Sequence, residues 1–319
     1  MDKDILILLA SVWLDICLGD PPFIPHPIVY IGKTISFIEK AVRRTGIPLR
    51  LAGFLLWIAT IMVVEMVITG ILFVSSYIHS FVYTGVTIYL IYTALAAKCL
   101  ACETLKVYKA LKENDLSKAR RQLSYLVGRD TSGLDASQIT RAAVETTAEN
   151  TIDGVLAPLF FLTIGFYIGI PVQLIFLYKT VNTLDSMVGY QQEPYTEIGF
   201  ASAKIDDAAN YLPARMGALM MLAGGYLTGY DIKNGWKVLK RDCRKHKSPN
   251  CGFPESAVAG LLGIQIGGTN TYFGEVVYKP SIGDAINNLK PEHIKDAIKI
   301  MYVSFGLTTM IIGMMMWLL

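Results

Sequence analysis

Four apolar stretches are long enough to cross a lipid bilayer, and they limit what this chain can fold into more than any other feature does. They occupy residues 51–78, 81–97, 155–178 and 301–319. A transmembrane helix needs about 20 mostly apolar residues, and only helices and closed barrels satisfy their backbone polar groups within lipid. Charged residues make up only 17% of the chain, against about 25% in soluble domains. We therefore expect an all-α, polytopic membrane protein, built as a helical bundle.

The distribution of Lys and Arg predicts how the chain is oriented in the membrane. The connection at 75–80 contains neither, whereas 33–50, 98–121 and 233–247 are all basic. Basic loops remain on the cytoplasmic side. This predicts a transmembrane hairpin at 51–97, cytoplasmic segments at 98–154 and 231–300, and a terminal transmembrane helix at 301–319. The weaker apolar stretches at 5–19 and 214–229 leave the number of crossings open.

Three further segments bear on the organisation of the chain. Gly169-Ile170-Pro171 interrupts the apolar stretch 155–181, and proline favours a turn there. We expect a broken or re-entrant helical hairpin in a multi-pass cell-membrane protein. Residues 98–127 have mixed charges and predict one solvated helical arm. Residues 248–283 are rich in Gly, Asn, Ser and Pro and predict an ordered loop. We expect residues 1–319 to form a single membrane-embedded domain.

An acidic helix follows Asp135. Asp135 and Gln138 have the spacing of a capping box, so we expect a helix to begin near residue 136. Residues spaced by four lie on one face of that helix; they are Arg141, Glu145, Glu149 and Asp153. One arginine cannot neutralise three carboxylates, and Mg²⁺ held by carboxylates and substrate phosphates would relieve their repulsion. A solvated acidic face is the alternative interpretation.

Two more polar groups follow apolar segments. NTLDSMVGY places Asn182 and Asp185 on one helix face, and ASAKIDDAANYLPAR contains Asp206 and Asp207. Fixed cations flank the second pair; they are Lys204 and Arg215. Carboxylates and cations beside a membrane indicate a phosphate-containing substrate handled with a divalent metal ion.

A glycine-rich block and a proline-rich block complete the polar segments. The glycine-rich block, 248–275, contains Asn250, Gly252, Asn270 and Tyr272. Its glycines would let backbone amides approach a ligand, although tight helix packing by small residues explains them equally well. In GDPPFIPHPIVYIGK, His26 lies among prolines, and a structural role is the alternative to a catalytic one.

Several functions are not supported by the sequence. The net charge of +3 and the lack of a basic stripe interleaved with aromatics give no indication of nucleic-acid binding. Gly32-Lys33-Thr34 resembles the end of a P-loop, but Pro27 stands where the first glycine belongs. If the protein uses ATP, it does so without a familiar nucleotide-binding motif.

Five segments together resemble one enzyme family. They are LGDPPFIPHPIVYIGK, GRDTSGLDASQITRAAVETTAENTIDGVLAPLFF, VNTLDSMVGY, IDDAANYLPARMGAL and SPNCGFPESAVAGLLG…GGTNTYFGE. In this order they are similar to the signature blocks of adenosylcobinamide-phosphate synthases, the CbiB/CobD family of membrane enzymes in cobalamin biosynthesis. The resemblance extends from about residue 10 to 319. Two departures are Cys251, where a small residue such as Ala is expected, and Glu255, where apolar residues are commoner.

The resemblance implies an acid–amine ligase that depends on ATP and Mg²⁺. The acid would be the corrinoid adenosylcobyric acid, and the amine would be (R)-1-aminopropan-2-ol phosphate or a related amino alcohol phosphate. We expect the active site on the cytoplasmic side of the lipid bilayer, in association with other membrane enzymes of cobalamin biosynthesis.

This chemistry suggests roles for the polar residues. The expected catalytic residues are Glu145, Glu149, Asp153, Asp185, Asp206 and Asp207. The first four are expected to hold Mg²⁺ and, with Asn182, to hold ATP through it. The last two would complete that shell or accept the amine proton. The residues expected to bind substrate or phosphate are Arg129, Asp130, Arg141, Asn150, Asn182, Lys204, Arg215, His26, Asn250, Gly252, Asn270 and Tyr272.

Two other functions remain as alternatives. The Asn-x-x-Asp and Asp-x-x-x-Asn pairs resemble the aspartate-rich motifs of intramembrane prenyltransferases, although Asn stands where that family prefers Asp. A small-solute transporter could use Glu65 and the broken segment 155–181 as its ion site. Such a transporter should have a second, corresponding broken segment, and only one is found.

Overall fold

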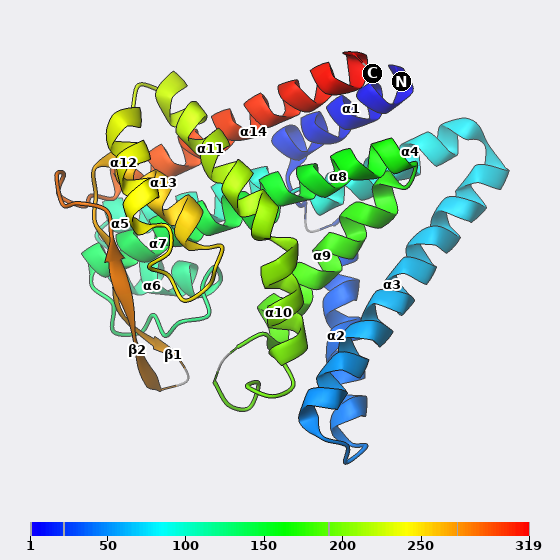
Figure 1. Ribbon diagram of the computed structural model, residues 1–319, viewed down its shortest axis with the longest axis horizontal. Helices are drawn as coiled ribbons and strands as arrows, with labels where there is room; N and C mark the ends of the chain where they lie inside the picture. The colour runs from blue at the N-terminus through cyan, green and yellow to red at the C-terminus, as the bar shows by residue number, and fades with distance from the viewer. Residues whose placement is uncertain (1, 22, 191, 273, 319) are drawn as a thin grey trace. The chain divides into compact units, whose positions relative to one another are not determined.

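The computed structural model describes residues 2–21, 23–190, 192–272 and 274–318, and it is mainly helical (Figure 1). Within the single domain expected from the sequence, the structure distinguishes two compact units. Unit 1 consists of Met1–Ala96, Pro158–Asn210 and Thr309–Leu319, and unit 2 of Ala97–Ala157 and Tyr211–Thr308.

Unit 1 contains the most apolar helices. Its elements are α1 (Asp2–Leu18), α2 (Pro27–Arg43), α3 (Leu49–Ile78), α4 (Ser80–Ala94), nearly all of α8 (Ala157–Ile168), α9 (Pro171–Val188), α10 (Phe200–Ala209) and the end of α14 (Glu292–Leu318). Helix α3 packs against α2, α4, α9 and α10, and α1 packs against α4. The buried face of α3 repeats every fourth residue, at Leu56, Thr60, Val64 and Ile68, as one helix face must.

The opposite face of α3 is apolar and exposed. Ile58, Met62 and Met66 are 45%, 66% and 69% exposed. Apolar side chains on the outside of a helix are expected where the surroundings are lipid. Candidate membrane spans in the described chain are Leu49–Ile78, Ser80–Lys112, Ala136–Ile168 and Glu292–Leu318. The expectation of a polytopic helical membrane protein is thus confirmed.

The predicted break in the apolar stretch 155–181 is present. Helix α8 ends at Ile168, and α9 begins with Pro171 at its first position. Gly169 has φ +78°, a left-handed conformation that glycine adopts without steric cost. A Cβ on Gly165 would lie 2.5 Å from the Cα of Pro171, so the chain approaches itself closely at this turn.

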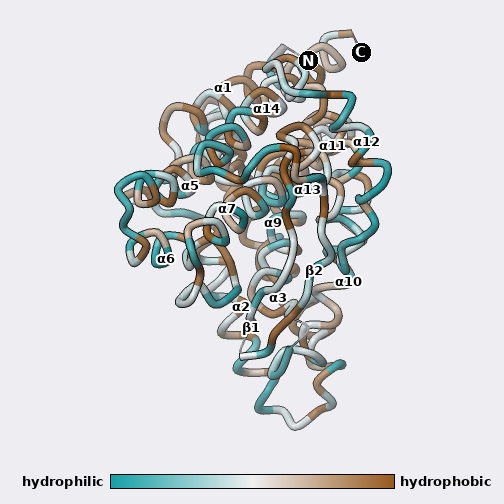
Figure 2. The backbone as a smooth tube through the Cα atoms, turned by 90° about the vertical axis from the view of Figure 1, so that its left-hand side faces the viewer, coloured by the Kyte–Doolittle hydropathy of each residue, from teal (hydrophilic) through white to brown (hydrophobic). Residues whose placement is uncertain are grey.

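Unit 2 contains the more polar helices and the hairpin. Its elements are α5 (Ala97–Lys112), α6 (Leu116–Ser124), α7 (Ala136–Thr151), the π-helical turn η1 (Ile152–Leu156), α11 (Tyr211–Leu227), α12 (Ile232–Asp242), α13 (Gly252–Leu262), β1 (Ile266–Tyr272), β2 (Glu275–Ile282) and most of α14. Figure 2 shows that α6 and α12 carry much of the hydrophilic chain, as their sequences LSKARRQLS and IKNGWKVLKRD predict.

The segment 98–127 departs from the single solvated arm expected. It forms two helices, because Asn114 takes a left-handed φ of 57° and the Asp115 side chain caps α6 by accepting from the amide of Lys118. Helix α5 is also not solvated all round, since it buries Leu100, Thr104 and other residues.

The segment 248–283 is not the ordered loop expected. Residues 252–262 form the buried helix α13, and β1 and β2 form an antiparallel hairpin. The glycines that suggested a loop permit close packing instead: a Cβ on Gly260 would lie 2.8 Å from the Cα of Gly235 on α12. Gly263, with φ +62°, ends α13 in the left-handed conformation common at helix C-termini.

Candidate functional site

Helix α7 begins where the sequence predicts. The Asp135 side chain accepts from the backbone N–H of Gln138, and the Gln138 side chain accepts from the backbone N–H of Asp135. This capping box aligns the following turns, so that Arg141 lies one turn before Glu145. The expected pairing of these two is present, with Arg141 Nε 3.7 Å from a Glu145 carboxylate oxygen.

Glu145 is almost fully buried, and its charge is compensated by unit 2 itself. Arg129 Nη2 lies 2.8 Å from one carboxylate oxygen, and the backbone N–H of Gly267 donates to the other at 2.8 Å. Arg129 also donates to the side-chain oxygen of Asn270 at 2.6 Å. Burial by itself lowers the pKa of Arg129, but Glu145 and the nearby Tyr272 raise it above its ordinary value. Glu145 therefore stabilises the attachment of the hairpin to α7.

Arg141 extends from α7 to the hairpin. Its guanidinium donates to the backbone carbonyl oxygens of Gly267 and Thr269, the second at 3.1 Å, and to the Asn270 side chain at 3.3 Å. Arg129, Arg141 and Glu145 together hold the first residues of β1 in place against α7.

A second polar cluster surrounds Cys251, which the sequence analysis singled out as a departure from the family pattern. The thiol of Cys251 donates to a carboxylate oxygen of Glu149 at 2.9 Å. Burial raises the pKa of this thiol, and the negative charges of Glu149, Asp153 and Glu255 raise it further. Three carboxylates from two helices and η1 thus act on one half-buried thiol.

The buried Glu255 and the half-buried Lys279 add a contact between an acid and an amine to this cluster. Lys279 Nζ lies 3.9 Å from a carboxylate oxygen of Glu255, whose side chain is 2% exposed. Burial raises the pKa of Glu255 to about 8, against the opposing charge of Lys279. Burial alone would lower the pKa of Lys279, but Glu255 and Glu149 raise it above its ordinary value. His246 lies near these charges, and burial lowers its pKa to about 4.

Sequence reasoning assigned no role to Lys279, Glu255 or His246. The available signal for Lys279 was a lysine within the strand sequence EVVYKPSI, two residues after the second of two valines. Glu255 was noticed only as a departure from the family pattern. Their proximity depends on the pairing of β2 with β1 and on the packing of α13, which no local pattern specifies.

Other predicted residues of unit 2 have well-defined partners. The Arg215 guanidinium lies over the rings of Tyr211 and Phe253, and it donates to the side chain of Asn250 at 3.4 Å. Asn150 donates to Thr146, one turn earlier on α7. The exposed Asp130 side chain accepts from the backbone N–H of Ser132. A Cβ on Gly252 would overlap the carbonyl oxygen of Cys243, so this glycine serves close packing.

Unit 1 contains the remaining predicted residues. Asn182 on α9 donates to Asp206 on α10 at 3.4 Å, and Asn210 donates to the other oxygen of Asp206 at 3.1 Å. Tyr178 in turn donates to Asn210 at 2.9 Å. These hydrogen bonds therefore join the α9 face that carries Asn182 to the α10 face that carries Asp206.

Four further predicted residues lie on or between the helices of unit 1. The Asp185 carboxylate lies over the backbone of Gly189, where a Cβ would overlap it. Lys204 and Asp207 form an ion pair at 4.0 Å on α10. His26 precedes α2 and lies 3.3 Å from Asp20.

The carboxylates of α7 and η1 are the oxygen ligands to compare with the needs of a magnesium ion. Among the described residues, no three His, Cys, Asp or Glu side chains are arranged as a metal site. Glu145 is engaged by Arg129 and Gly267. Glu149 and Asp153 fit the pattern in which one or two carboxylates hold Mg²⁺ together with water and substrate phosphates.

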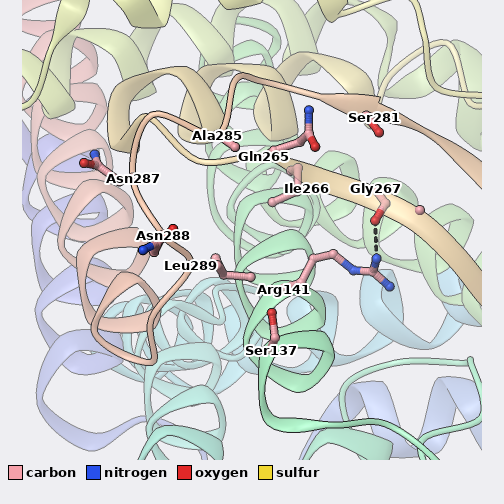
Figure 3. A pocket seen from close by; sticks show the side chains of 11 residues that line it. Ser137, Arg141, Gln265, Ile266, Gly267, Ser281, Ala285, Asn287, Asn288 and Leu289 are labelled. Atoms are coloured by element: carbon pink, nitrogen blue, oxygen red, sulfur yellow. Dashed lines mark hydrogen bonds between the residues drawn. The ribbon is translucent and has the colours of Figure 1, made fainter.

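A cavity of about 380 Å³ lies in unit 2, between the start of α7, the start of β1 and the loop before α14 (Figure 3). Figure 3 shows Arg141 reaching from α7 to Gly267, with Asn288 and Leu289 on the facing loop. The polar side chains that line it are Ser137, Arg141, Gln265, Ser281, Asn287 and Asn288. Ile266, Ala285 and Leu289 are the apolar residues that line it.

Comparisons with known proteins extend over nearly the whole chain. The pattern of the family described as CobD/Cbib protein matches residues 8–301. Cobalamin biosynthesis protein CobD of Klebsiella pneumoniae subsp. pneumoniae is 44% identical, with 98% of each chain covered. CobD of Photorhabdus laumondii subsp. laumondii is 45% identical over 97% of each chain. Cobalamin biosynthesis protein CbiB of Salmonella typhi is 46% identical over 91% of each chain. No solved structure matches.

These similarities agree with the family recognised from the five sequence segments. None of the three relatives is named as a prenyltransferase or a transporter. The similarity includes α7, the α12–α13 segment and the hairpin, which together form the clusters described above. The chain therefore belongs to the CobD/CbiB family of cobalamin biosynthesis proteins.

Proposed function

We propose that the protein is an adenosylcobinamide-phosphate synthase. It would join (R)-1-aminopropan-2-ol phosphate, or a related amino alcohol phosphate, to the free propionate of adenosylcobyric acid. The observation that carries this proposal is the similarity to cobalamin biosynthesis proteins over nearly the whole chain. The clusters of unit 2 support it, because they place carboxylates and cations near one another in a largely buried environment.

The reaction requires an activated carboxylate. A carboxylate oxygen of the corrinoid would attack the γ-phosphorus of ATP, and ADP would leave. The amine nitrogen would then attack the acyl carbon, and phosphate would leave with the former carboxylate oxygen. The amine loses a proton in forming the amide, so the site must also accept that proton.

The acidic residues can be divided between two roles in this proposal. Glu149 and Asp153 would hold Mg²⁺, which when bound neutralises phosphate charge during phosphoryl transfer. Glu145 would position β1 through Arg129 and Arg141. In unit 1, we retain Asn182 and Asp185 as candidate metal or ATP ligands.

The remaining residues would bind phosphate or accept the proton. Asp206 and Asp207 are candidate proton acceptors or metal ligands. Candidate phosphate-binding residues are Arg129, Arg141, Lys204 and Arg215. Cationic side chains stabilise transferring phosphoryl groups when they are held rigidly, and stacking between Tyr211 and Phe253 holds Arg215 in this way.

The test is an activity assay on the full chain in detergent. Adenosylcobyric acid, aminopropanol phosphate, ATP and Mg²⁺ are supplied, and the corrinoid is followed by mass spectrometry. We expect a mass gain equal to the amine minus water only when ATP is present. Removing the metal with EDTA should abolish it, and added Mg²⁺ should restore it.

Three variants test the proposed metal ligands. Glu149→Gln and Asp185→Asn should lose product, whereas Glu113→Gln, at an exposed residue paired with Lys118, should retain it. Product from every variant would retain the synthase and reject these two ligands. Neither product nor ADP from a folded, monodisperse wild-type chain would reject the synthase.

A further inference from the structure

The cavity beside Arg141 has the lining expected of a binding site for a small anion. Among the described residues that line it, Arg141 is the only one with a charged side chain. No carboxylate is among these described lining residues, and the nearest partner of Arg141 is the Glu145 carboxylate, 3.7 Å from its Nε. Hydroxyl and amide groups from Ser137, Gln265 and Asn288 can donate hydrogen bonds to the oxygens of such a ligand.

Two glycines at the start of β1 leave room for the Arg141 side chain beside this cavity. Gly267 and Gly268 have φ of +92° and +100°, conformations that other residues rarely adopt. A Cβ on Gly268 would lie 2.6 Å from Arg141 Nη1. A side chain at Gly268 would therefore displace the guanidinium that gives the cavity its charge.

The volume and lining distinguish among the three substrates of the proposed reaction. Pockets that enclose drug-sized ligands measure about 300–1,000 Å³, and this cavity, at about 380 Å³, is at the lower end. A corrinoid macrocycle is far larger than such ligands. No aromatic side chain among the described lining residues could stack on adenine, so ATP fits poorly.

We propose that the cavity between Arg141, Gly268 and Asn288 binds the phosphorylated amino alcohol, a small phosphate monoester that carries an ammonium group. This assignment rests on the synthase proposed above. A phosphate monoester carries a charge of about −1.5 to −2 at neutral pH, so the ligand is negative overall and matches the cationic lining. Ile266 and Leu289 contact its short carbon chain.

Asn288→Asp tests this proposal with little risk to folding, because the Asn288 side chain is exposed. The added carboxylate repels phosphate. Asn114→Asp is the matched control, since it makes the same change at an exposed residue of unit 2 outside the cavity. Binding of phosphoethanolamine, inorganic phosphate and ATP to the purified full chain is measured by calorimetry.

We expect Asn288→Asp to weaken phosphoethanolamine binding about tenfold, while ATP binding and the Asn114→Asp protein remain like the wild type. Unchanged phosphoethanolamine binding in Asn288→Asp would overturn the proposal. Equal affinity of the wild type for inorganic phosphate and phosphoethanolamine would also overturn it, because the site would then recognise an anion alone.

Kinetics separate this inference from the proposed function. If the wild type forms the amide and Asn288→Asp leaves the KM for the amine unchanged, the synthase stands and the cavity assignment falls. If the binding pattern holds but no amide forms, the cavity is a site for amine phosphates and the synthase assignment falls.

Discussion

At the scale of single residues, the buried ion pair between Arg129 and Glu145 should be costly to break by removing one partner. Arg129→Met would leave the buried Glu145 carboxylate without its closest cation, and Asn270 would lose the nearer of its two arginine donors. Removing one partner of a buried pair costs about 3–5 kcal/mol. We expect a loss of this size in the free energy of unfolding, measured by denaturation in detergent micelles.

A matched substitution provides the control for this prediction. Arg244 is exposed, and Arg244→Met should change the free energy of unfolding by about 0.5 kcal/mol or less. Equal effects of the two substitutions would contradict a special role for the buried pair. The double variant Arg129→Met with Glu145→Leu should recover part of the loss, because no uncompensated charge remains buried.

Glu255 predicts a dependence of stability on pH. The pKa of its carboxyl is raised by burial from 4.5 to about 8, so between these values the folded chain holds a proton that the unfolded chain has released. The contribution of Glu255 to the free energy of unfolding should therefore fall as the pH rises from 4.5 to 8, by at most about 1.4 kcal/mol per pH unit. Burial lowers the pKa of His246 from an ordinary 6.5 to about 4. Its contribution to the free energy of unfolding therefore rises with pH between these values and is nearly constant above them.

The pH range above 6.5 isolates the effect of Glu255 from that of His246. Unfolding is compared at pH 6.5 and pH 8 for the wild type and for Glu255→Gln, which remains neutral throughout. The wild type should lose stability over this interval, and the variant should lose markedly less. The same decline in both proteins would show that another group titrates.

At the scale of elements, the β1–β2 hairpin depends on Gly267. Alanine there would adopt an unfavourable positive φ and also overlap the carbonyl oxygen of Pro280. Gly274 has a similar φ, +83°, but nothing lies within 4 Å of the position its Cβ would take. Gly274→Ala therefore measures the backbone strain alone, about 1–2 kcal/mol.

We expect Gly267→Ala to destabilise the chain by clearly more than Gly274→Ala does. It should also weaken the contact between the Gly267 backbone N–H and Glu145. Hydrogen exchange of the β1 amides, compared between the two variants, reports this directly. Equal protection of β1 in both variants would show that Gly267 is needed only for its backbone conformation.

At the scale of the whole molecule, the basic segments predict its orientation in the membrane. His79 lies between α3 and α4 in a connection without Lys or Arg, whereas Lys247 follows the basic helix α12. In a variant whose five cysteines are replaced by Ser, we expect an impermeant maleimide to label His79→Cys in intact cells. Lys247→Cys should be labelled only after permeabilisation. The reverse pattern would contradict the cytoplasmic placement of the basic segments.

Local signals in the sequence were sufficient for much of the architecture. The apolar composition of 51–78 predicts a membrane helix, and α3 occupies Leu49–Ile78. Asp135 and Gln138 predict the start of α7, and Gly169 with Pro171 predicts the turn before α9. Each of these features depends on residues only a few positions apart, so the chain's own local energetics decide it.

Longer-range features could not be predicted in this way. Glycines in 248–283 suggested a loop, yet they allow α13 to pack closely and the hairpin to turn, because the same residue suits both uses. The spacing of Glu145, Glu149 and Asp153 predicted one acidic face, and it could not indicate that Arg129 and the Gly267 amide engage Glu145 or that Cys251 donates to Glu149.

The chain by itself determined that this is a helical membrane protein with an acidic helix at α7, and its motifs indicated the family. Only the tertiary structure decided that Glu145 is neutralised by Arg129, that Cys251 donates to Glu149, and that Lys279 pairs with Glu255. The physical reason is that a buried charge must find a partner. Which partner it finds depends on the packing of segments that may lie about a hundred positions apart, as Glu149 and Cys251 do.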